Sequence, residues 1–193
     1  MNRPFVLIAS TSVACSLLAF AGDAHALGPV DLEVGAKVGG ATNPVSGSGA
    51  TNPLGFGVGG RAGLAFLGGI YVGGNIMYYF GGSQNENLVG AAGNSSVSVS
   101  FNTLMYGGEL GYGIKILDLL TIRPQVGLGN ANITASAAGQ SNSSGYVYVE
   151  PGVTGLIGLG LLFVGADANV LLLPTLSGNQ AAFSIHGQIG VQF

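Results

Sequence analysis

The chain has 193 residues and a formal net charge of −3, from five Lys and Arg residues against eight Asp and Glu residues. Only 7% of its residues are charged and 36 are glycine, whereas about 25% of the residues in a soluble domain are charged. This composition argues against an ordinary soluble domain, and the lack of a basic patch excludes nucleic acid as a partner.

Residues 1–26 have the features of a secretory signal peptide. Arg3 supplies the positive n-region, residues 5–20 form the apolar h-region, and Ala24-His25-Ala26 is an A-x-A-like cleavage site. We therefore expect cleavage after residue 26 and export of residues 27–193 as one domain.

Two alternatives for this N-terminal segment are less favoured. A membrane-anchoring helix would not carry the early cleavage signal. A lipoprotein would be acylated at Cys15, but Ser12 stands where such a signal normally has Leu. Cys15 is the only cysteine, so we expect the exported chain to form no internal disulfide.

Apolar and polar residues alternate along much of the remaining chain, as in residues 30–39 and 183–193. This alternation predicts β-strands with one apolar and one polar face. The longest apolar stretch after the signal, residues 153–166, is interrupted by glycines that weaken a helix. Because a membrane protein without membrane helices must be a closed barrel, the sequence predicts an all-β fold: a closed, antiparallel, up-and-down transmembrane β-barrel.

The alternation predicts eight strands, separated by short turns and longer polar loops in alternation. In outer-membrane barrels the tight turns are periplasmic and the longer loops are external, so an even number of strands puts both termini on the periplasmic side. The expected strands are residues 30–39, 54–66, 70–80, 97–114, 120–130, 146–157, 161–173 and 183–193. The expected turns are 67–69, 116–119 and 158–160, and the expected loops are 41–53, 81–96, 133–145 and 174–180.

Three places in this scheme are irregular. The apolar register shifts near Asn102 and Thr103, which indicates either a bulge or a strand that projects beyond the membrane. Pro124 and Pro151 fall within predicted strands. Because proline lacks a ladder donor, each should mark a local bulge or the end of regular pairing.

The charged side chains after residue 26 fall on the register opposite the aliphatic ones, except in the expected loops and turns. An eight-stranded barrel is just wide enough for side chains to fill it, so we expect a polar, cross-linked interior with no open pore. A proton path or a gate is the less favoured interpretation of the same groups. Interior glycines should leave room for these long side chains. The predicted interior charge network is Asp31, Glu33, Lys37, Arg61, Glu109, Arg123, Glu150 and Asp167.

Aromatic residues on the apolar register predict belts at the two membrane interfaces, although packing in a soluble sandwich remains an alternative. Those expected near the loops are Tyr78, Phe80 and Tyr106, and those expected near the turns are Phe66, Tyr112 and Phe193.

The whole pattern resembles the small outer-membrane barrels of the OmpA/OmpX-like group. The most specific part is the last strand, whose residues Phe183, Ile185, Ile189, Val191 and Phe193 resemble the signal that the barrel-assembly machinery recognises. The resemblance implies a location in the outer membrane, contact with membrane lipid and lipopolysaccharide, recognition by that machinery, and interior acid–base clusters.

Three function classes compete: a structural or surface barrel with interacting loops, a narrow channel or transporter of small or apolar solutes, and a lipid-modifying enzyme. The enzyme would need a nucleophile and a base, and only His186, with Ser184 beside it on the same face, offers that combination. We favour His186 as a lumen-filling polar residue and the chain as a non-enzymatic surface barrel. No metal-binding constellation is present, no cofactor is predicted, and the loop sequences identify no ligand.

Overall fold

The alternating segments form antiparallel strands in the computed structural model of the chain, which describes residues 30–45, 51–66, 68–90, 93–116, 119–176 and 180–193. No helix in these ranges is long and apolar enough to cross a membrane. The strands are β1 (Val30–Ala41), β2 (Gly55–Phe66), β3 (Ile70–Gly90), β4 (Gly93–Tyr112), β5 (Ile114–Ile116), β6 (Leu120–Ala137), β7 (Gln140–Leu159), β8 (Leu162–Leu173) and β9 (Gln180–Gln192).

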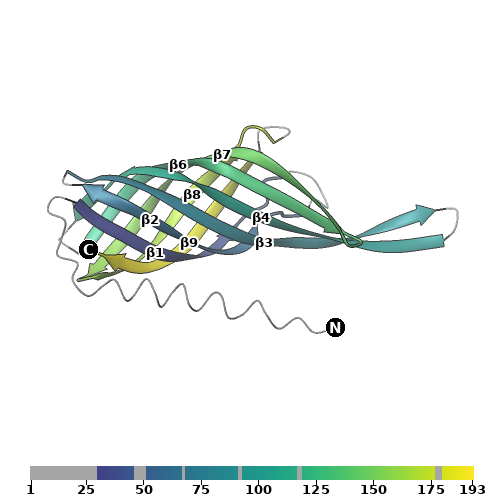
Figure 1. Ribbon diagram of the computed structural model, residues 1–193, viewed down its shortest axis with the longest axis horizontal. Coiled ribbons are helices and arrows are strands. Elements are labelled where there is room, and N and C mark those ends of the chain that lie inside the picture. Colours follow the sequence, from purple (N-terminus) through teal and green to yellow (C-terminus); the bar gives the residue numbers. More distant parts are fainter. Residues whose placement is uncertain (1–29, 46–50, 67, 91–92, 117–118, 177–179) are drawn as a thin grey trace.

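These strands close into a barrel of eight (Figure 1). β5 continues β4 in the same register against β6, so the two segments form one strand of the barrel. β1 pairs with both β2 and β9, and Leu32 exchanges two backbone hydrogen bonds with Phe193, of 2.9 and 3.0 Å. The predicted closed, antiparallel, up-and-down barrel is confirmed.

The two ends of the barrel differ. The beginning of β1 and the C-terminus lie together at the end with short connections, called here the turn end (Figure 1). There, Gly68, Gly69 and Gly160 have positive φ angles of 94°, 91° and 74°, which a glycine adopts without strain. The opposite end is called the loop end. The predicted signal peptide, residues 1–26, lies outside the described residues.

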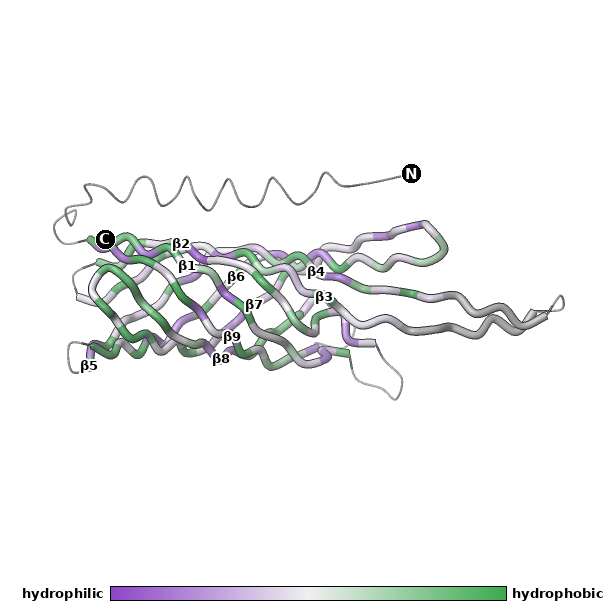
Figure 2. The backbone as a smooth tube through the Cα atoms, turned by 90° about the horizontal axis from the view of Figure 1, so that it is seen from below, coloured by the Kyte–Doolittle hydropathy of each residue, from purple (hydrophilic) through white to green (hydrophobic). Residues whose placement is uncertain are grey.

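Two of the predicted loops are strands instead. Residues 81–90 and 93–96 extend β3 and β4, and residues 133–137 and 140–145 extend β6 and β7. Hydroxyl side chains pair across the second hairpin: Thr134 Oγ1 donates to Ser143 Oγ at 3.1 Å, and Ser136 Oγ lies 2.8 Å from Ser141 Oγ. Both hairpins project from the loop end of the barrel (Figures 1 and 2).

The irregularity predicted on the fourth strand lies on its neighbour. β4 runs unbroken through Asn102 and Thr103, whereas β3 carries a bulge between Phe80 and Ser83. The bulge brings β3 against the loop before β2, where Gly82 N donates to Asn52 O at 2.8 Å. A strand that projects beyond the barrel, the second interpretation of this shift, is present.

Neither proline produces a bulge. Pro124 lies within a continuous β6–β7 ladder, and the break between β4 and β5 is on its other side, with the register unchanged. Pro151 lies within a gap in the β7–β8 ladder, where pairing is lost between Val149 and Gly152 and resumes in the same register. Each proline therefore removes a donor where the ladder pauses.

The exterior is apolar between the two ends, and Figure 2 shows apolar residues, in green, along the strands of the barrel. Ile76, Leu110 and Leu128 are each more than half exposed. Near the loop end Phe80 stacks on Phe56, with ring centroids 6.4 Å apart, and meets Tyr78 edge-on at 5.1 Å. Exposed aliphatic side chains framed by aromatic ones are the surface that a bilayer requires of a barrel.

Candidate functional site

The interior of the barrel has two layers. The middle and the turn-end half hold most of the predicted charge network, with Glu33, Lys37, Arg61, Glu109, Arg123, Glu150 and Asp167 all buried. The loop-end half holds an apolar core of Leu54, Met77, Tyr79, Met105, Ala131, Tyr148, Leu171, Leu173 and Ala182. The expectation of a wholly polar interior was therefore wrong. The apolar side chains of this core lie on the inner register, where polar side chains were expected.

The first ionic cluster is built on Glu33. Arg123 Nη1 and Nη2 donate to the two carboxylate oxygens of Glu33 at 2.8 and 2.6 Å. Arg61 Nη2 donates to Glu33 Oε2 at 2.7 Å, and its Nη1 donates to Gln188 Oε1 at 3.2 Å. One carboxylate on β1 therefore joins β2 and β6 across the lumen, with the two-pronged geometry that makes Arg–carboxylate pairs strong.

Tyr71 lies between the two guanidinium groups. Its ring centroid is 4.6 Å from Arg61 Cζ and 4.1 Å from Arg123 Cζ, within the range of cation–π attraction. Tyr71 was not among the interior residues predicted from the sequence. Its signal was available, since Tyr71 is a large side chain on the inner register between the outward Ile70 and Val72.

Interior glycines make room mainly for aromatic rings. A Cβ on Gly63 would lie 2.5 Å from Tyr71 Oη, and one on Gly57 would lie 2.6 Å from the ring of Tyr79. Gly111 and Gly127 match our expectation of glycines facing charged side chains, because a Cβ there would lie 3.0 Å from Arg123 Cγ and 3.5 Å from Glu150 Cβ, respectively.

The second ionic cluster is a chain of four side chains. Lys37 Nζ lies 3.0 Å from Asp167 Oδ2, and Asp167 Oδ1 lies 2.7 Å from His186 Nδ1. The other ring nitrogen, His186 Nε2, lies 2.7 Å from Tyr79 Oη. Both ring nitrogens are thus engaged with protein groups, and His186 is 1% exposed.

Two predicted network carboxylates accept hydrogen bonds from neutral groups. Glu150 Oε1 accepts from Ser184 Oγ at 3.0 Å, and Glu109 Oε1 accepts from Asn75 Nδ2 at 2.6 Å. Tyr148 Oη in turn donates to Asn75 Oδ1 at 3.1 Å. The ion pairs formed within the described part of the chain join Glu33 to Arg61 and Arg123, and Asp167 to Lys37.

Asp31 lies apart from these clusters. It is exposed at the turn end, where it and Lys115 line a hollow of about 500 Å³ that reaches Glu33 and Arg123. Asp31 was expected in the interior network, but the first residues of β1 lie at the rim, where water replaces a protein partner.

The arrangement of Ser184 and His186 does not form a catalytic pair. They are two residues apart on β9, and Ser184 Oγ donates to Glu150 while His186 contacts Asp167 and Tyr79. A nucleophile needs its base within hydrogen-bond reach. Among the described residues, no group of three or more His, Cys, Asp or Glu side chains is placed to hold a metal ion.

The predicted assembly-signal residues lie on the outer face of β9, except Phe193, which directly follows the strand. Phe183, Ile185 and Ile189 are each more than half exposed, whereas Val191 and Phe193 are partly buried. This apolar face therefore belongs to the C-terminal strand, which closes the barrel by pairing with β1.

No protein-family model and no curated protein sequence matches the chain. Several solved structures do match. A major outer membrane protein from Thermus thermophilus has a TM-score of 0.62 and 12% identity over 85% of this chain and 99% of its own. Neisserial surface protein A has a TM-score of 0.60 and 9% identity over 86% and 97%. Ail, the attachment invasion locus protein of Yersinia pestis, has a TM-score of 0.53 and 12% identity over 85% and 97%. The chain therefore has the fold of the small eight-stranded, OmpA/OmpX-like outer-membrane barrels, with the apolar exterior that such a barrel presents to lipid.

Proposed function

We propose that the chain is a closed, non-enzymatic barrel whose projecting sheet acts as an interaction surface outside the cell. The observation that carries the proposal is the pairing of β4 with β6 beyond the barrel. Val99, Ser100 and Phe101 pair with residues 135–137, so the two long hairpins join into one four-stranded sheet. Such a sheet presents its side chains in fixed positions, which a flexible loop does not.

The chemistry of this surface favours an uncharged, hydrophilic partner. The loop-end segments 42–54, 81–102, 131–147 and 174–181 contain no Lys or Arg and a single carboxylate, Glu86. Ail has been solved in complex with the heparin analogue sucrose octasulfate, an anion that calls for basic side chains. Because our chain has none at its loop end, we propose recognition through hydroxyl groups such as those of Thr134 and Ser143 and amide groups such as that of Asn142, and no binding of sulfated glycans.

A filled lumen is the second part of the proposal. The apolar core and the two ionic clusters follow one another along the axis, and a solute would have to displace both. This favours the surface role over the alternative of a narrow channel. Planar bilayers containing the purified barrel should show no sustained conductance, and stable openings would support the channel instead.

Export and assembly complete the proposal. We expect cleavage after Ala26, which N-terminal sequencing of the purified membrane protein would detect as a chain that starts at Leu27. We also expect the last strand to be read by the barrel-assembly machinery. Deletion of Phe193 should then reduce the amount of folded protein in cells more than it reduces refolding of the purified chain in detergent.

Two experiments test the surface role. Ser141→Cys should react with a membrane-impermeant maleimide on intact cells, whereas Thr121→Cys, at the turn end, should react only after permeabilisation. A variant in which residues 133–145 are replaced by a two-residue turn should fold but lose adherence to surfaces coated with neutral glycans. Adherence by the full chain that soluble heparin abolishes would contradict the proposal.

A further inference from the structure

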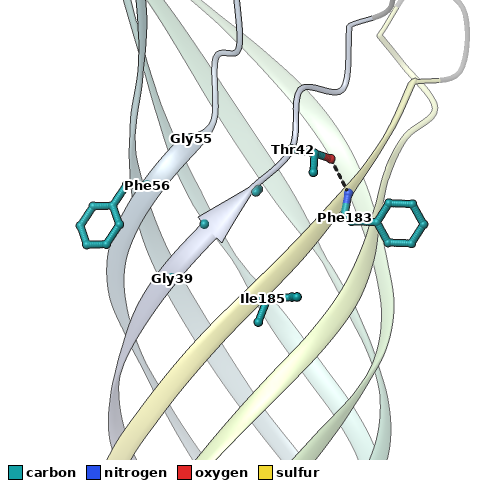
Figure 3. A pocket seen from close by; sticks show the side chains of 8 residues that line it. Gly39, Thr42, Gly55, Phe56, Phe183 and Ile185 are labelled. Atoms are coloured by element: carbon teal, nitrogen blue, oxygen red, sulfur yellow. Dashed lines mark hydrogen bonds between the residues drawn. The ribbon is translucent and has the colours of Figure 1, made fainter.

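A shallow apolar groove crosses the outer face of β1 near the loop end (Figure 3). Its volume is about 370 Å³. Phe56 of β2 stands on one side, and Phe183 and Ile185 of β9 stand on the other (Figure 3). The residues lining it are Gly39, Gly40, Ala41, Thr42, Gly55, Phe56, Phe183 and Ile185.

The groove exists because one outward position lacks a side chain. Gly40 pairs with Phe56 on one side and with Ile185 on the other, and all three positions face outward. Neighbouring strands lie about 4.8 Å apart, so the two large side chains flank a trough one strand wide. Stacking of Phe80 on Phe56 supports one wall.

The polar groups of Thr42 and Phe183, where the groove reaches the loop end, already form hydrogen bonds with each other. Thr42 N donates to Phe183 O at 2.8 Å, and Phe183 N donates to Thr42 Oγ1 at 2.9 Å. The backbone of Gly40 lies within the β1 ladders. An occupant therefore gains apolar contact and no new hydrogen bond from these groups.

We propose that this groove is a binding site for one acyl chain of a membrane lipid in the loop-end leaflet. The groove is continuous with the lipid-facing band, because Val38, Val58 and Ile189 follow on the same outward register. Its walls are among the most exposed apolar side chains, with Phe183 67% and Ile185 66% exposed. A linear alkyl chain fits a trough of this width, and it buries the aromatic walls on both sides.

The site holds the lipid through its chain and not through its headgroup. Residues 38–60 and 174–193 contain no Lys or Arg, so no basic side chain in these segments pairs with a phosphate. Lipids with different headgroups and the same acyl chains should therefore bind equally well.

Gly40→Leu fills the groove, and Gly74→Leu is its matched control. A Cβ on either glycine would lie 3.3 Å from one glycine carbonyl oxygen, that of Gly55 or of Gly107. Both glycines lie on outward positions of strands, but Gly74 is on β3, away from the groove. A second pair, Phe56→Ala and Phe66→Ala, removes an outward ring of β2 at the groove or at the turn end.

The experiment uses the folded barrel in nanodiscs of phosphatidylcholine containing a phosphatidylcholine with a diazirine on its acyl chain. After illumination, mass spectrometry maps the labelled peptides. Residues 38–42 and 183–185 of the wild type should carry more label than outward residues on β3 and β4. Gly40→Leu and Phe56→Ala should lower that label about fourfold, which is the change in binding constant expected when one methylene group is no longer buried. Gly74→Leu and Phe66→Ala should leave the label unchanged.

Folding of each variant is checked by the faster migration of the unboiled protein on gels. If Gly40→Leu does not fold, Phe56→Ala decides. Three outcomes would overturn the proposal: equal label around the whole circumference, label that the groove variants do not change, or a wild-type barrel that occupies the nanodiscs as a dimer and becomes monomeric in Gly40→Leu. The last outcome would assign the groove to a second copy of the protein. None of these results bears on the projecting sheet, so the proposed surface role is tested separately.

Discussion

Arg123 holds both carboxylate oxygens of Glu33, at 2.8 and 2.6 Å, across 90 residues of sequence. Arg123 is 3% exposed and Glu33 is 4% exposed. Breaking a buried pair by removing one partner costs about 3–5 kcal/mol. Since Glu33 keeps Arg61, we expect Arg123→Ala to lower the free energy of unfolding by about 3 kcal/mol, at the lower end of that range, as measured by urea unfolding in lipid vesicles.

Two comparisons make this prediction specific. Glu33→Ala strands both Arg61 and Arg123 and should destabilise the barrel more than Arg123→Ala does. Lys115→Ala changes an exposed side chain and should have little effect. Arg123→Ala should also open no large conductance in planar bilayers, because the apolar core at the loop end remains. A large, stable pore in that variant would contradict the proposed filled lumen.

Tyr71 separates the contribution of a ring from that of a hydroxyl. Its ring contacts Arg61 and Arg123, whereas its buried hydroxyl has no hydrogen-bond partner among the described residues. We expect Tyr71→Phe to be neutral or slightly stabilising. Tyr71→Leu should cost about 2 kcal/mol through loss of desolvated cation–π attraction. Equal losses in urea midpoints for the two variants would show that the ring contacts add nothing.

Adjacent glycines on β4 test which face is inside. A Cβ on Gly107 would lie 2.5 Å from Tyr148 Oη, whereas a Cβ on Gly108 finds its nearest neighbour, Gly73 O, at 3.8 Å. Gly107→Ala should destabilise the barrel by about 1–3 kcal/mol through overpacking. Gly108→Ala should be neutral or stabilise the barrel by about 0.5 kcal/mol, because alanine reduces the conformational entropy of the unfolded chain. The reverse order in thermal unfolding would mean that the register is inverted.

The strands that cross the membrane could be predicted because a bilayer imposes a two-residue period on them. The projecting hairpins could not. Residues 133–145 are mostly Ser, Ala and Asn, which have weak strand preference, and their strand form depends on pairing such as that of Thr134 with Ser143. The alternation rule needs one apolar face, and outside the membrane neither face has to be apolar.

The interior could be predicted only as a set of inward positions. Pairing of Glu33 with Arg123 depends on how strands on opposite sides of the lumen are staggered, which local sequence does not encode. The inward Met77 and Leu171 were missed for a different reason. An apolar residue suits either lipid or a protein core, and the barrel contains both.

His186 is the residue on which the enzyme hypothesis depends, and its contacts predict a structural role. Replacement by Ala leaves Asp167 with Lys37 and Asn169, and Tyr79 Oη without its partner, so the free energy of unfolding should fall by about 1–3 kcal/mol. Tyr79→Phe removes the same contact from the other side, and the two changes together should cost less than their sum. Lipid A from cells that express the wild type or His186→Ala should have identical masses. Catalysis would be established if lipid A from wild-type and Tyr79→Phe cells differed in mass from lipid A of cells without the protein, while lipid A from His186→Ala cells did not. A purely structural His186 would not separate the two variants in this way.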